Sequence, residues 1–236
     1  MRFRLPMKPT VFLLAAFAFA LVALIPLRVA AGWFGLGGLA AREAEGSIWL
    51  GVLKEAQFGP VALGDVRARL NILPLLVGRA RLSLSRDAAD GAFEGALSVS
   101  RHSFALDDLT GQIRTGTLFA PVPLGMLDLD DVSVGFANGL CESADGRVRA
   151  TVSGEMGGIA LPAGLAGDVR CAQGALLVPL ASQSGMGQLN LAIRADGSYR
   201  LDLVVRQTDP SLAPRLTAAG FRLSGEGYTR RIEGHF

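Results

Sequence analysis

The feature that most constrains this chain is a strict alternation of apolar and polar residues that recurs from residue 66 almost to the C-terminus. In the first run, Val66, Ala68 and Leu70 alternate with Arg67 and Arg69. Because successive side chains of a β-strand point to opposite faces, this period places every apolar side chain on one face. Comparable runs occupy residues 80–85, 93–100, 103–109, 127–136, 147–153, 165–171, 175–180, 188–195, 198–205 and 221–223. The sequence therefore predicts a large antiparallel sheet.

Asp-Gly and Asn-Gly pairs lie between or beside these runs. They supply the positive backbone φ that tight hairpin turns require. The pairs are Asp90-Gly91, Asn138-Gly139, Asp145-Gly146 and Asp196-Gly197. The clearest hairpin is predicted from 188–195, through Asp196-Gly197, to 198–205.

Helical patterning is sparse after the first 28 residues. Short helices are expected at 75–77, 122–126 and 212–219, and Pro214 and Gly220 limit the last of them. None can cover a sheet of this many strands, so the sheet must bury its apolar face by curling, by forming a sandwich or by enclosing a groove. The predicted fold class is mainly β, with a single N-terminal transmembrane helix.

The N-terminal segment reads as a membrane anchor. Residues 11–27 carry no polar side chain, and at ~1.5 Å per residue they span ~26 Å, close to the thickness of a bilayer core. Arg2, Arg4 and Lys8 precede this run and Arg28 follows it. The positive-inside rule then places the N-terminus in the cytoplasm and the C-terminal domain in the periplasm of a cell with an inner membrane.

The expected organisation is a cytoplasmic basic tail at 1–10, a transmembrane helix at 11–28, a juxtamembrane linker at 29–44 and a periplasmic β-rich domain at 45–236. Trp33 is expected at the level of the lipid headgroups. A cleaved signal peptide is the alternative, because Val29-Ala30-Ala31 presents small residues where a signal peptidase cuts. Both interpretations export the β-rich domain.

The distribution of charge argues against nucleic acid as a partner. The whole chain has 23 basic and 21 acidic residues, but the first 28 residues hold four bases and no acid. Acidic residues are therefore in a slight majority after Arg28. Such a domain lacks the basic surface that binding to a phosphate backbone requires.

The two cysteines fit an exported protein. Cys141 and Cys171 stand thirty positions apart, each beside a predicted strand. A disulfide between them would stabilise the fold by roughly 3–4 kcal/mol on the loop-entropy model. The alternative is a pair of buried free thiols.

Residues that carry chemistry are scarce. The only histidines are His102 and His235, and no serine lies in a Gly-x-Ser-x-Gly motif. The run Asp128-Leu129-Asp130-Asp131 suggests a calcium site, but its alternation with apolar residues favours the solvated face of a strand. We therefore expect neither an enzyme nor a catalytic, metal or cofactor site.

Two other segments are candidates for interaction with a partner. Gly46 and Gly51 flank Trp49, whose alternative role is that of a core tryptophan on the first strand. Pro74, Leu75 and Leu76 belong to a compact apolar plug, residues 73–79, that interrupts the alternation. The alternative for the plug is a strand crossover that seals one end of the core.

An ordered set of short segments resembles the type II secretion system protein N family. The set begins with the basic N-terminus, the single membrane helix and the glycine-flanked Trp49. The later members are residues 72–79, Cys141 with 146–148, 167–171 with 176–180, 196–200, 220–221 and 227–234. The likeness covers nearly the whole chain in order.

The resemblance implies an accessory component of the secretion machinery, anchored in the inner membrane with a β-rich domain in the periplasm. It implies other secretion subunits and inner-membrane lipid as partners, and no catalytic residue. An edge strand or the Trp49 region would make the protein contacts. The alternative function is a periplasmic carrier of lipid or acyl chains, with a groove like that of AsmA-like proteins, and it predicts an open apolar channel between the inner faces of the sheet.

Overall fold

The computed structural model describes most of the chain after residue 38. The described ranges are 39–58, 61–75, 77–88, 91–115, 119–120, 122, 124–152, 154–156, 159–160, 164–206, 209–225 and 227–235, with five isolated residues between 11 and 24. Arg2, Arg4, Lys8, Arg28 and Trp33 lie outside them, as does most of the predicted anchor. Among the described residues, no helix has both the length and the apolar character to cross a membrane.

The described strands form one antiparallel sheet and one separate two-stranded ribbon. The sheet follows the order β1-β3-β4-β5-β6-β7-β8-β9-β12-β14-β15-β16-β18-β17, with β2 also pairing with β3 and β13 with β14. Most spatial neighbours are also neighbours in sequence, so the sheet is largely a meander. This architecture confirms the predicted mainly β fold with one large antiparallel sheet and few short helices.

The strand bounds are as follows. The N-terminal half contains β1 (Leu39–Ala40), β2 (Glu43–Ser47), β3 (Leu50–Phe58), β4 (Val61–Asn71), β5 (Ala80–Arg86), β6 (Phe93–Val99) and β7 (Ser103–Arg114). The two long central strands are β8 (Leu124–Ala137) and β9 (Leu140–Val152). The C-terminal half contains β12 (Gly164–Asp168), β13 (Arg170–Ala172), β14 (Ala175–Ser182), β15 (Gly187–Ile193), β16 (Ser198–Val205), β17 (Arg222–Ser224) and β18 (Gly227–His235). The ribbon pairs β10 (Glu155–Met156) with β11 (Ile159–Ala160).

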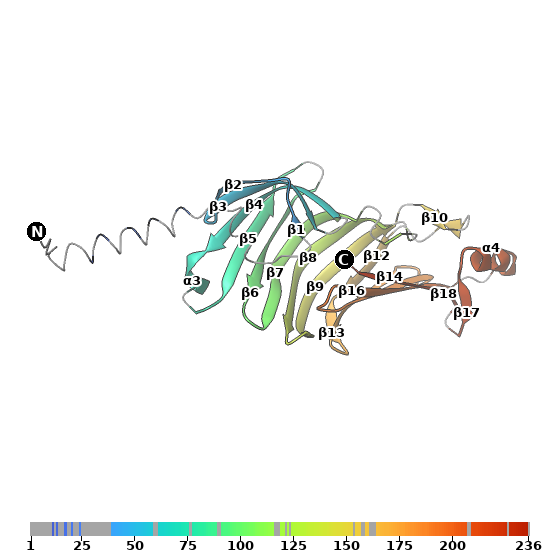
Figure 1. Cartoon of the computed structure of the whole chain (residues 1–236). Helices are drawn as coiled ribbons and strands as arrows, with labels where there is room; N and C mark the ends of the chain where they lie inside the picture. Colours follow the sequence, from blue (N-terminus) through green and yellow to red (C-terminus); the bar gives the residue numbers. More distant parts are fainter. Residues whose placement is uncertain are drawn as a thin grey trace, which may run out of the picture.

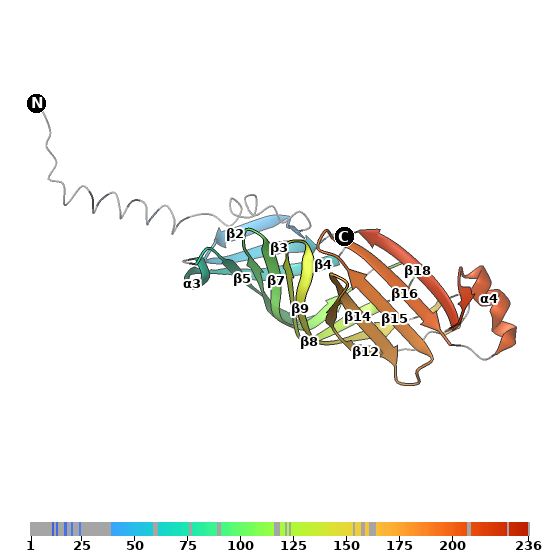
Figure 2. The same ribbon diagram turned by 90° about the horizontal axis from the view of Figure 1, so that it is seen from below.

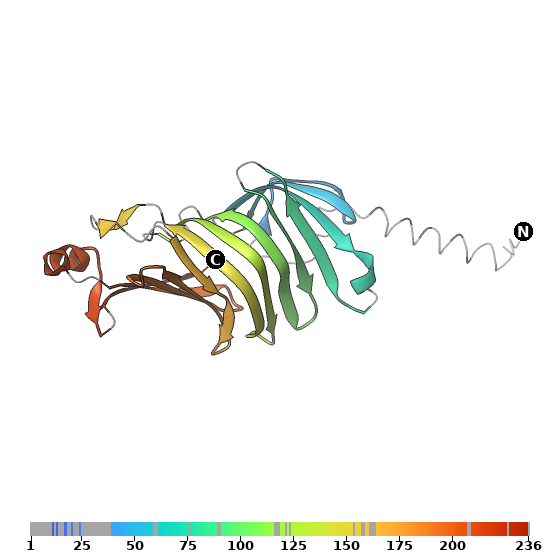
Figure 3. The same cartoon turned by 180° about the vertical axis from the view of Figure 1, so that it is seen from behind.

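After residue 38, helical structure in the described part of the chain is confined to short segments. α3 (Ile72–Leu75) connects β4 to β5, and η1 (Pro210–Leu212) leads into α4 (Ala213–Ala218). Figure 1 shows the sheet as a strongly curved row of strands, with α3 and α4 near opposite ends of the molecule. Figure 3 shows the same curvature from behind, and Figure 2 shows β14, β15, β16 and β18 as a row that ends beside α4.

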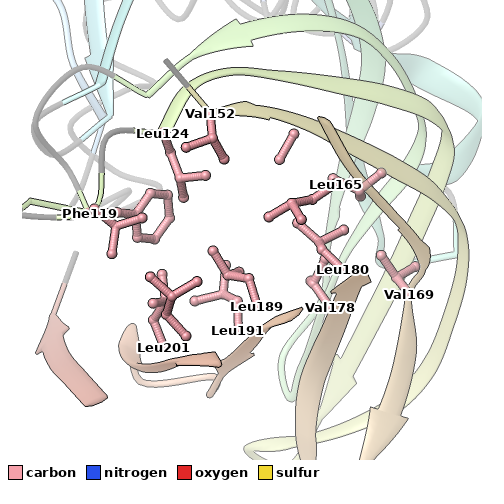
Figure 4. Close-up of a cluster of buried hydrophobic side chains, with 14 of the residues drawn as sticks. Phe119, Leu124, Val152, Leu165, Val169, Val178, Leu180, Leu189, Leu191 and Leu201 are labelled. Carbon is pink, nitrogen blue, oxygen red and sulfur yellow. The ribbon is translucent and has the colours of Figure 1, made fainter. Parts of the chain in front are cut away.

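The main core fills the C-terminal half. Side chains from β8 and β9 face side chains from β14, β15 and β16 across the interior, so the curled sheet covers its own apolar face (Figure 4). Leu201 is fully buried at 0% exposure, and Phe221, which follows α4, is also buried. The core members labelled in Figure 4 are Phe119, Leu124, Val152, Leu165, Val169, Val178, Leu180, Leu189, Leu191 and Leu201.

The N-terminal half has two smaller apolar clusters. Leu53, Ala56, Val66, Ala68 and Phe93 form the first, between β3, β4 and β6. The second is a pair of buried residues, Ile48 in the turn between β2 and β3 and Leu70 at the end of β4, with Trp49 packed against it. The N-terminal half is therefore held together by less buried surface than the C-terminal half.

Three of the β-bulges in the curved sheet are built in the same way. Glu55, Asp108 and Asp131 have positive φ values of 49°, 54° and 53°, and each lies at a register shift between neighbouring strands. The backbone N–H of each donates to a side-chain oxygen of the adjacent strand: Asp65 Oδ1 at 3.0 Å, Ser133 Oγ at 2.9 Å and Thr110 Oγ1 at 3.1 Å, respectively. Bulges increase the local twist of a sheet, so they favour the curl that closes the core.

The outer face carries cross-strand ion pairs. Arg147 Nε lies 2.8 Å from Asp168 Oδ1, and this hydrogen bond and the arginine charge hold the pKa of the Asp168 carboxyl below its ordinary value. Arg149 and Asp130 form a longer pair at 3.8 Å. Asp130 thus lies on the exposed face of β8, as the solvated-face interpretation of the acidic run predicts. Exposed pairs of this kind each contribute little to stability.

Two predicted turns are confirmed. β15 and β16 form the expected hairpin around Asp196-Gly197, in a register that pairs Ile193 with Tyr199. Asn138 and Gly139 join β8 to β9 with φ values of 50° and 79°, the positive pair that a tight hairpin requires.

Two other predictions are wrong. Asp145-Gly146 is not a turn, because β9 continues through it, and Gly146 lies opposite the bulge at Asp131 and Val132. The segment 122–126 is not a helix, since β8 already begins at Leu124. The expected helix at 212–219 is confirmed in a shorter form, as α4.

The predicted disulfide is present. Cys141 at the start of β9 is bonded to Cys171 in β13, with the two Cα atoms 5.5 Å apart. The alternative of free thiols is therefore wrong. The bond joins a long central strand to β13, whose ladder partner among the described strands is β14, so it fixes β13 to the middle of the sheet.

Candidate interaction surfaces

The Trp49 segment is a tight hairpin at one end of the sheet. Ile48 and Trp49 form the two-residue turn between β2 and β3, so Trp49 does not lie on a strand as the core interpretation predicts. Its ring is half-buried and packs against the small cluster of Ile48 and Leu70. Leu50, the next residue, is exposed.

The two glycines beside this turn have a structural role. Gly46 and Gly51 face each other in the register of β2 and β3, and Gly51 is buried. Gly46 has a φ of 85°, and a Cβ there would lie 2.5 Å from the carbonyl oxygen of Leu50. The glycine pattern around Trp49 is therefore explained by the backbone of the hairpin.

The hairpin carries a compact charge cluster on its exposed face. Lys54 Nζ lies 2.5 Å from Glu45 Oε1 and 3.7 Å from Glu43 Oε2. The hydrogen bond to Glu45 and the charges of both glutamates raise the pKa of the Lys54 amine above its ordinary value. The exposed face of this hairpin therefore carries paired charges.

The apolar plug is a capped helical turn. Leu73, Pro74 and Leu75 lie in α3; Leu76 lies outside the described residues. The Arg79 N–H donates to the Pro74 carbonyl at 3.0 Å and the Gly78 N–H to the Leu75 carbonyl at 3.0 Å. This is the Schellman pattern, and Gly78 takes the left-handed position with a φ of 73°.

The turn does not seal the core. Ile72, Leu73 and Val77 are exposed, with Leu73 at 79%, and Leu75 is exposed to a lesser degree. The crossover alternative predicts that this segment seals the core, and these four side chains do not do so. We refer to Ile72, Leu73, Leu75 and Val77 as the apolar knob.

The fold brings the two sequence candidates to one corner of the sheet. The Leu70 N–H at the end of β4 donates to the Ile48 carbonyl in the Trp49 turn at 3.0 Å, and α3 begins two residues after Leu70. Trp49 and the knob are thus neighbours. The alternation of apolar and polar residues does not reveal that Trp49 and the knob are neighbours, because their proximity depends on how β2, β3 and β4 pair.

Gly78→Ala should destabilise the chain by about 1–2 kcal/mol, because a left-handed backbone brings Cβ too close to the following carbonyl. No atom would crowd the new methyl group, so the loss would report backbone strain alone. Urea unfolding of the full chain in detergent measures it. Gly164→Ala is the matched control, since that glycine has equally open surroundings without a positive φ. Equal losses in both variants would contradict the role given to Gly78.

Two shallow grooves lie next to this corner. The larger, about 790 Å³, is lined by Arg67, Arg69, Arg81, Glu94 and Asp107 among others. The second, about 610 Å³, runs from α3 across β6, β7 and β8 and shares Arg81 and Asp107. Arg81 bridges the carboxylates of Asp107, at 3.1 Å, and Asp108, at 3.5 Å, so the charges between the grooves compensate one another.

Among the described residues, His102 is not paired with Asp107 or Asp108, the carboxylates of the strand that it precedes. His102 is exposed in the turn before β7, and its backbone carbonyl accepts the Asn138 N–H at 2.9 Å. Asp107 and Asp108 lie further along β7 and are paired with Arg81. Within the described residues, no group of three or more His, Cys, Asp and Glu side chains is placed to hold a metal ion.

The strand at the far edge of the sheet, β18, is not predicted by the alternation of apolar and polar residues. β18 pairs with β16 from Tyr228 to His235, whereas β17 covers only Gly227 to Thr229 on its other side. In the part of the chain that the structure describes, no strand pairs with the outer edge of β18 from Arg231 to Gly234. The sheet is therefore open at this edge.

The C-terminal interior does not offer the channel that the lipid-carrier alternative predicts. The described side chains that point inward from β8, β9 and β14 to β16 are in contact and form one cluster. Figure 4 shows labelled members of this cluster pointing toward one another between the facing strands. The packing of these described side chains does not favour a lipid-filled groove between them.

These features define a class of protein: an open, curled β-sheet domain whose distinctive surfaces are an unpaired edge and an exposed apolar turn. Residues 37–231 match the family model of the type II secretion system (T2SS), protein N. The chain belongs to this family, and it is a component of the type II secretion machinery, as the resemblance in its sequence predicts. No curated protein and no solved structure matches it.

Proposed function

We propose that this protein is an accessory component of type II secretion, anchored in the inner membrane, whose periplasmic β-domain acts through contacts with other secretion subunits. Membership of the family supports the role in secretion. The apolar run at 11–27, with bases before it, supports the anchor and its orientation. The disulfide supports a periplasmic location, because such bonds persist in oxidising compartments.

The observation that carries the proposal is the open edge of β18. Unpaired N–H and C=O groups on an edge strand are a template for pairing with another chain. Ile232, in the middle of the open stretch, is half-buried against the main core. An extended segment of a partner would continue the hydrogen-bond ladder and cover the flank of the core, which is recognition by strand addition.

The opposite edge is less suited to this contact. β2 is five residues long, and Gly46 departs from strand geometry near its end. Glu43 and Glu45 are already paired with Lys54 beside it. Charge and irregular geometry are common devices that keep an edge strand from pairing.

Site-specific photocross-linking tests the contact in cells that contain the complete secretion system. A photoreactive residue at Arg231, on β18, should give an adduct with another secretion subunit. Arg149 on β9 is the matched control, because both arginines are exposed and form cross-strand ion pairs. Adducts of equal yield at both positions, or at neither, would count against strand addition at this edge.

The orientation in the membrane has a separate test. A reporter enzyme that is active only after export, fused to the C-terminus, should be active in whole cells. A cytosolic reporter at the same position should be inactive. The reverse pattern would exclude the periplasmic location.

A further inference from the structure

The apolar knob is the largest concentration of exposed aliphatic side chains in the described part of the chain. Leu73 and Val77 are 79% and 74% exposed, and Ile72 and Leu75 accompany them. Leu50 lies at the same corner of the sheet. The other exposed large apolar residues among those described after residue 38 stand singly in the sequence. Single exposed residues are ordinary, whereas a cluster marks a contact.

The small size of the knob favours contact with a lipid surface over contact with a protein. A stable protein interface buries about 800 Å² per partner around aromatic or arginine anchors. The knob offers four aliphatic side chains, each smaller than an aromatic side chain, which buries ~150–250 Å². A protruding apolar turn of this size instead resembles the segments that insert shallowly at the boundary between headgroups and acyl chains.

Positive charge lies beside the knob. Arg79 directly follows its Schellman turn, and Arg101 lies in the neighbouring turn between β6 and β7, since Ala80 pairs with Val99. Both side chains are exposed, and neither forms an ion pair among the described residues. Arginines next to inserted apolar side chains can reach the anionic headgroups.

The N-terminal segment is long enough to allow this orientation. Arg28 and Leu39 are eleven residues apart, so the chain between them can extend ~36–40 Å. Leu39 pairs with Phe58, and the Trp49 turn lies at the other end of β3, ~26 Å away at ~3.3 Å per residue. The reach of the linker exceeds this length, so an anchored chain can place the knob against the bilayer.

We propose that the apolar knob inserts into the interfacial region of the membrane in which the chain is anchored. The inference rests on the membrane anchor proposed above and adds a second point of attachment. Two attachments would fix the tilt of the sheet relative to the membrane. The open edge of β18, at the other side of the sheet, would then face away from the knob, toward partners in the periplasm (Figure 1).

The test uses the full chain in vesicles of phosphatidylethanolamine and phosphatidylglycerol. A nitroxide label is attached at Leu73→Cys and, in a second protein, at Leu223→Cys. Leu223 is the matched control, a leucine of 74% exposure on β17, far from the knob. The native cysteines form a disulfide and do not react without reductant.

In the vesicles, the label at position 73 should be less accessible to a water-soluble nickel chelate than the label at position 223. It should also be more accessible to oxygen than the label at 223. Equal nickel accessibility at both positions, in protein that floats with the vesicles, would overturn the insertion and leave the anchor intact. Failure to float would overturn both. Protection of position 73 only after other secretion subunits are added would assign the knob to a protein partner and overturn the lipid contact.

Discussion

Leu201→Ala is expected to destabilise the folded chain by about 3–5 kcal/mol, the cost of a cavity in a core that cannot collapse around it. Leu201 is fully buried. It pairs with Leu191 and Ile232 on the neighbouring strands, and its side chain points into the main core (Figure 4). Its neighbours are held by the sheet on both sides, so little relaxation is available.

This prediction also separates the two functional interpretations. In a closed core, the three carbon atoms lost from the leucine side chain leave an empty space. In a channel that holds lipid, an acyl chain would fill that space and the loss would be small. Urea unfolding of the full chain in detergent measures the difference, and Leu223→Ala is the control, expected within about 0.5 kcal/mol of the original protein. A loss below about 1 kcal/mol at Leu201 would favour the lipid carrier.

The strands were predictable wherever the alternation was regular. β16 has the predicted bounds, and β15 begins one residue before its predicted start and ends two residues before its predicted end. The first hairpin was less visible because the bulge at Glu55 shifts the pattern: Leu53 and Ala56, three positions apart, are both buried. A bulge depends on the partner strand, so local periodicity does not reveal it.

β18 was missed for a similar reason. Arg230 occupies a position on the inner face, between Tyr228 and Ile232, where the alternation calls for an apolar residue. The structure accommodates the arginine because its guanidinium donates to the backbone carbonyl of Ala219, which follows α4. That carbonyl is brought there by tertiary structure, so the strand lacked its expected signature.

The residues of the apolar knob were predictable from the sequence, but their exposure was not. An apolar run such as 72–77 suggests burial, and the sequence alone does not show that α3 projects beyond the last paired residues of β4 and β5. The proximity of α3 to Trp49 likewise follows from the pairing of β2, β3 and β4. Exposure and juxtaposition are properties of the assembled sheet.

Loss of the Cys141–Cys171 disulfide is expected to cost roughly 3–4 kcal/mol, because the bond closes a loop of about thirty residues and so restricts the unfolded chain. Within that loop lie most of β9, all of β12 and part of β13. β13 has β14 as its ladder partner, so without the bond this short strand should detach first.

Urea unfolding of the double variant Cys141→Ser, Cys171→Ser, compared with the oxidised protein, measures the cost. Reduction of the original protein should reproduce it, and the same reductant should leave the stability of the double variant unchanged. Because the bond forms only in an oxidising compartment, chain retained in the cytosol by removal of its first 28 residues should carry two free thiols and show the stability of the double variant. Equal stability of the oxidised and reduced forms would mean that β9 and β13 are already held together in the unfolded ensemble.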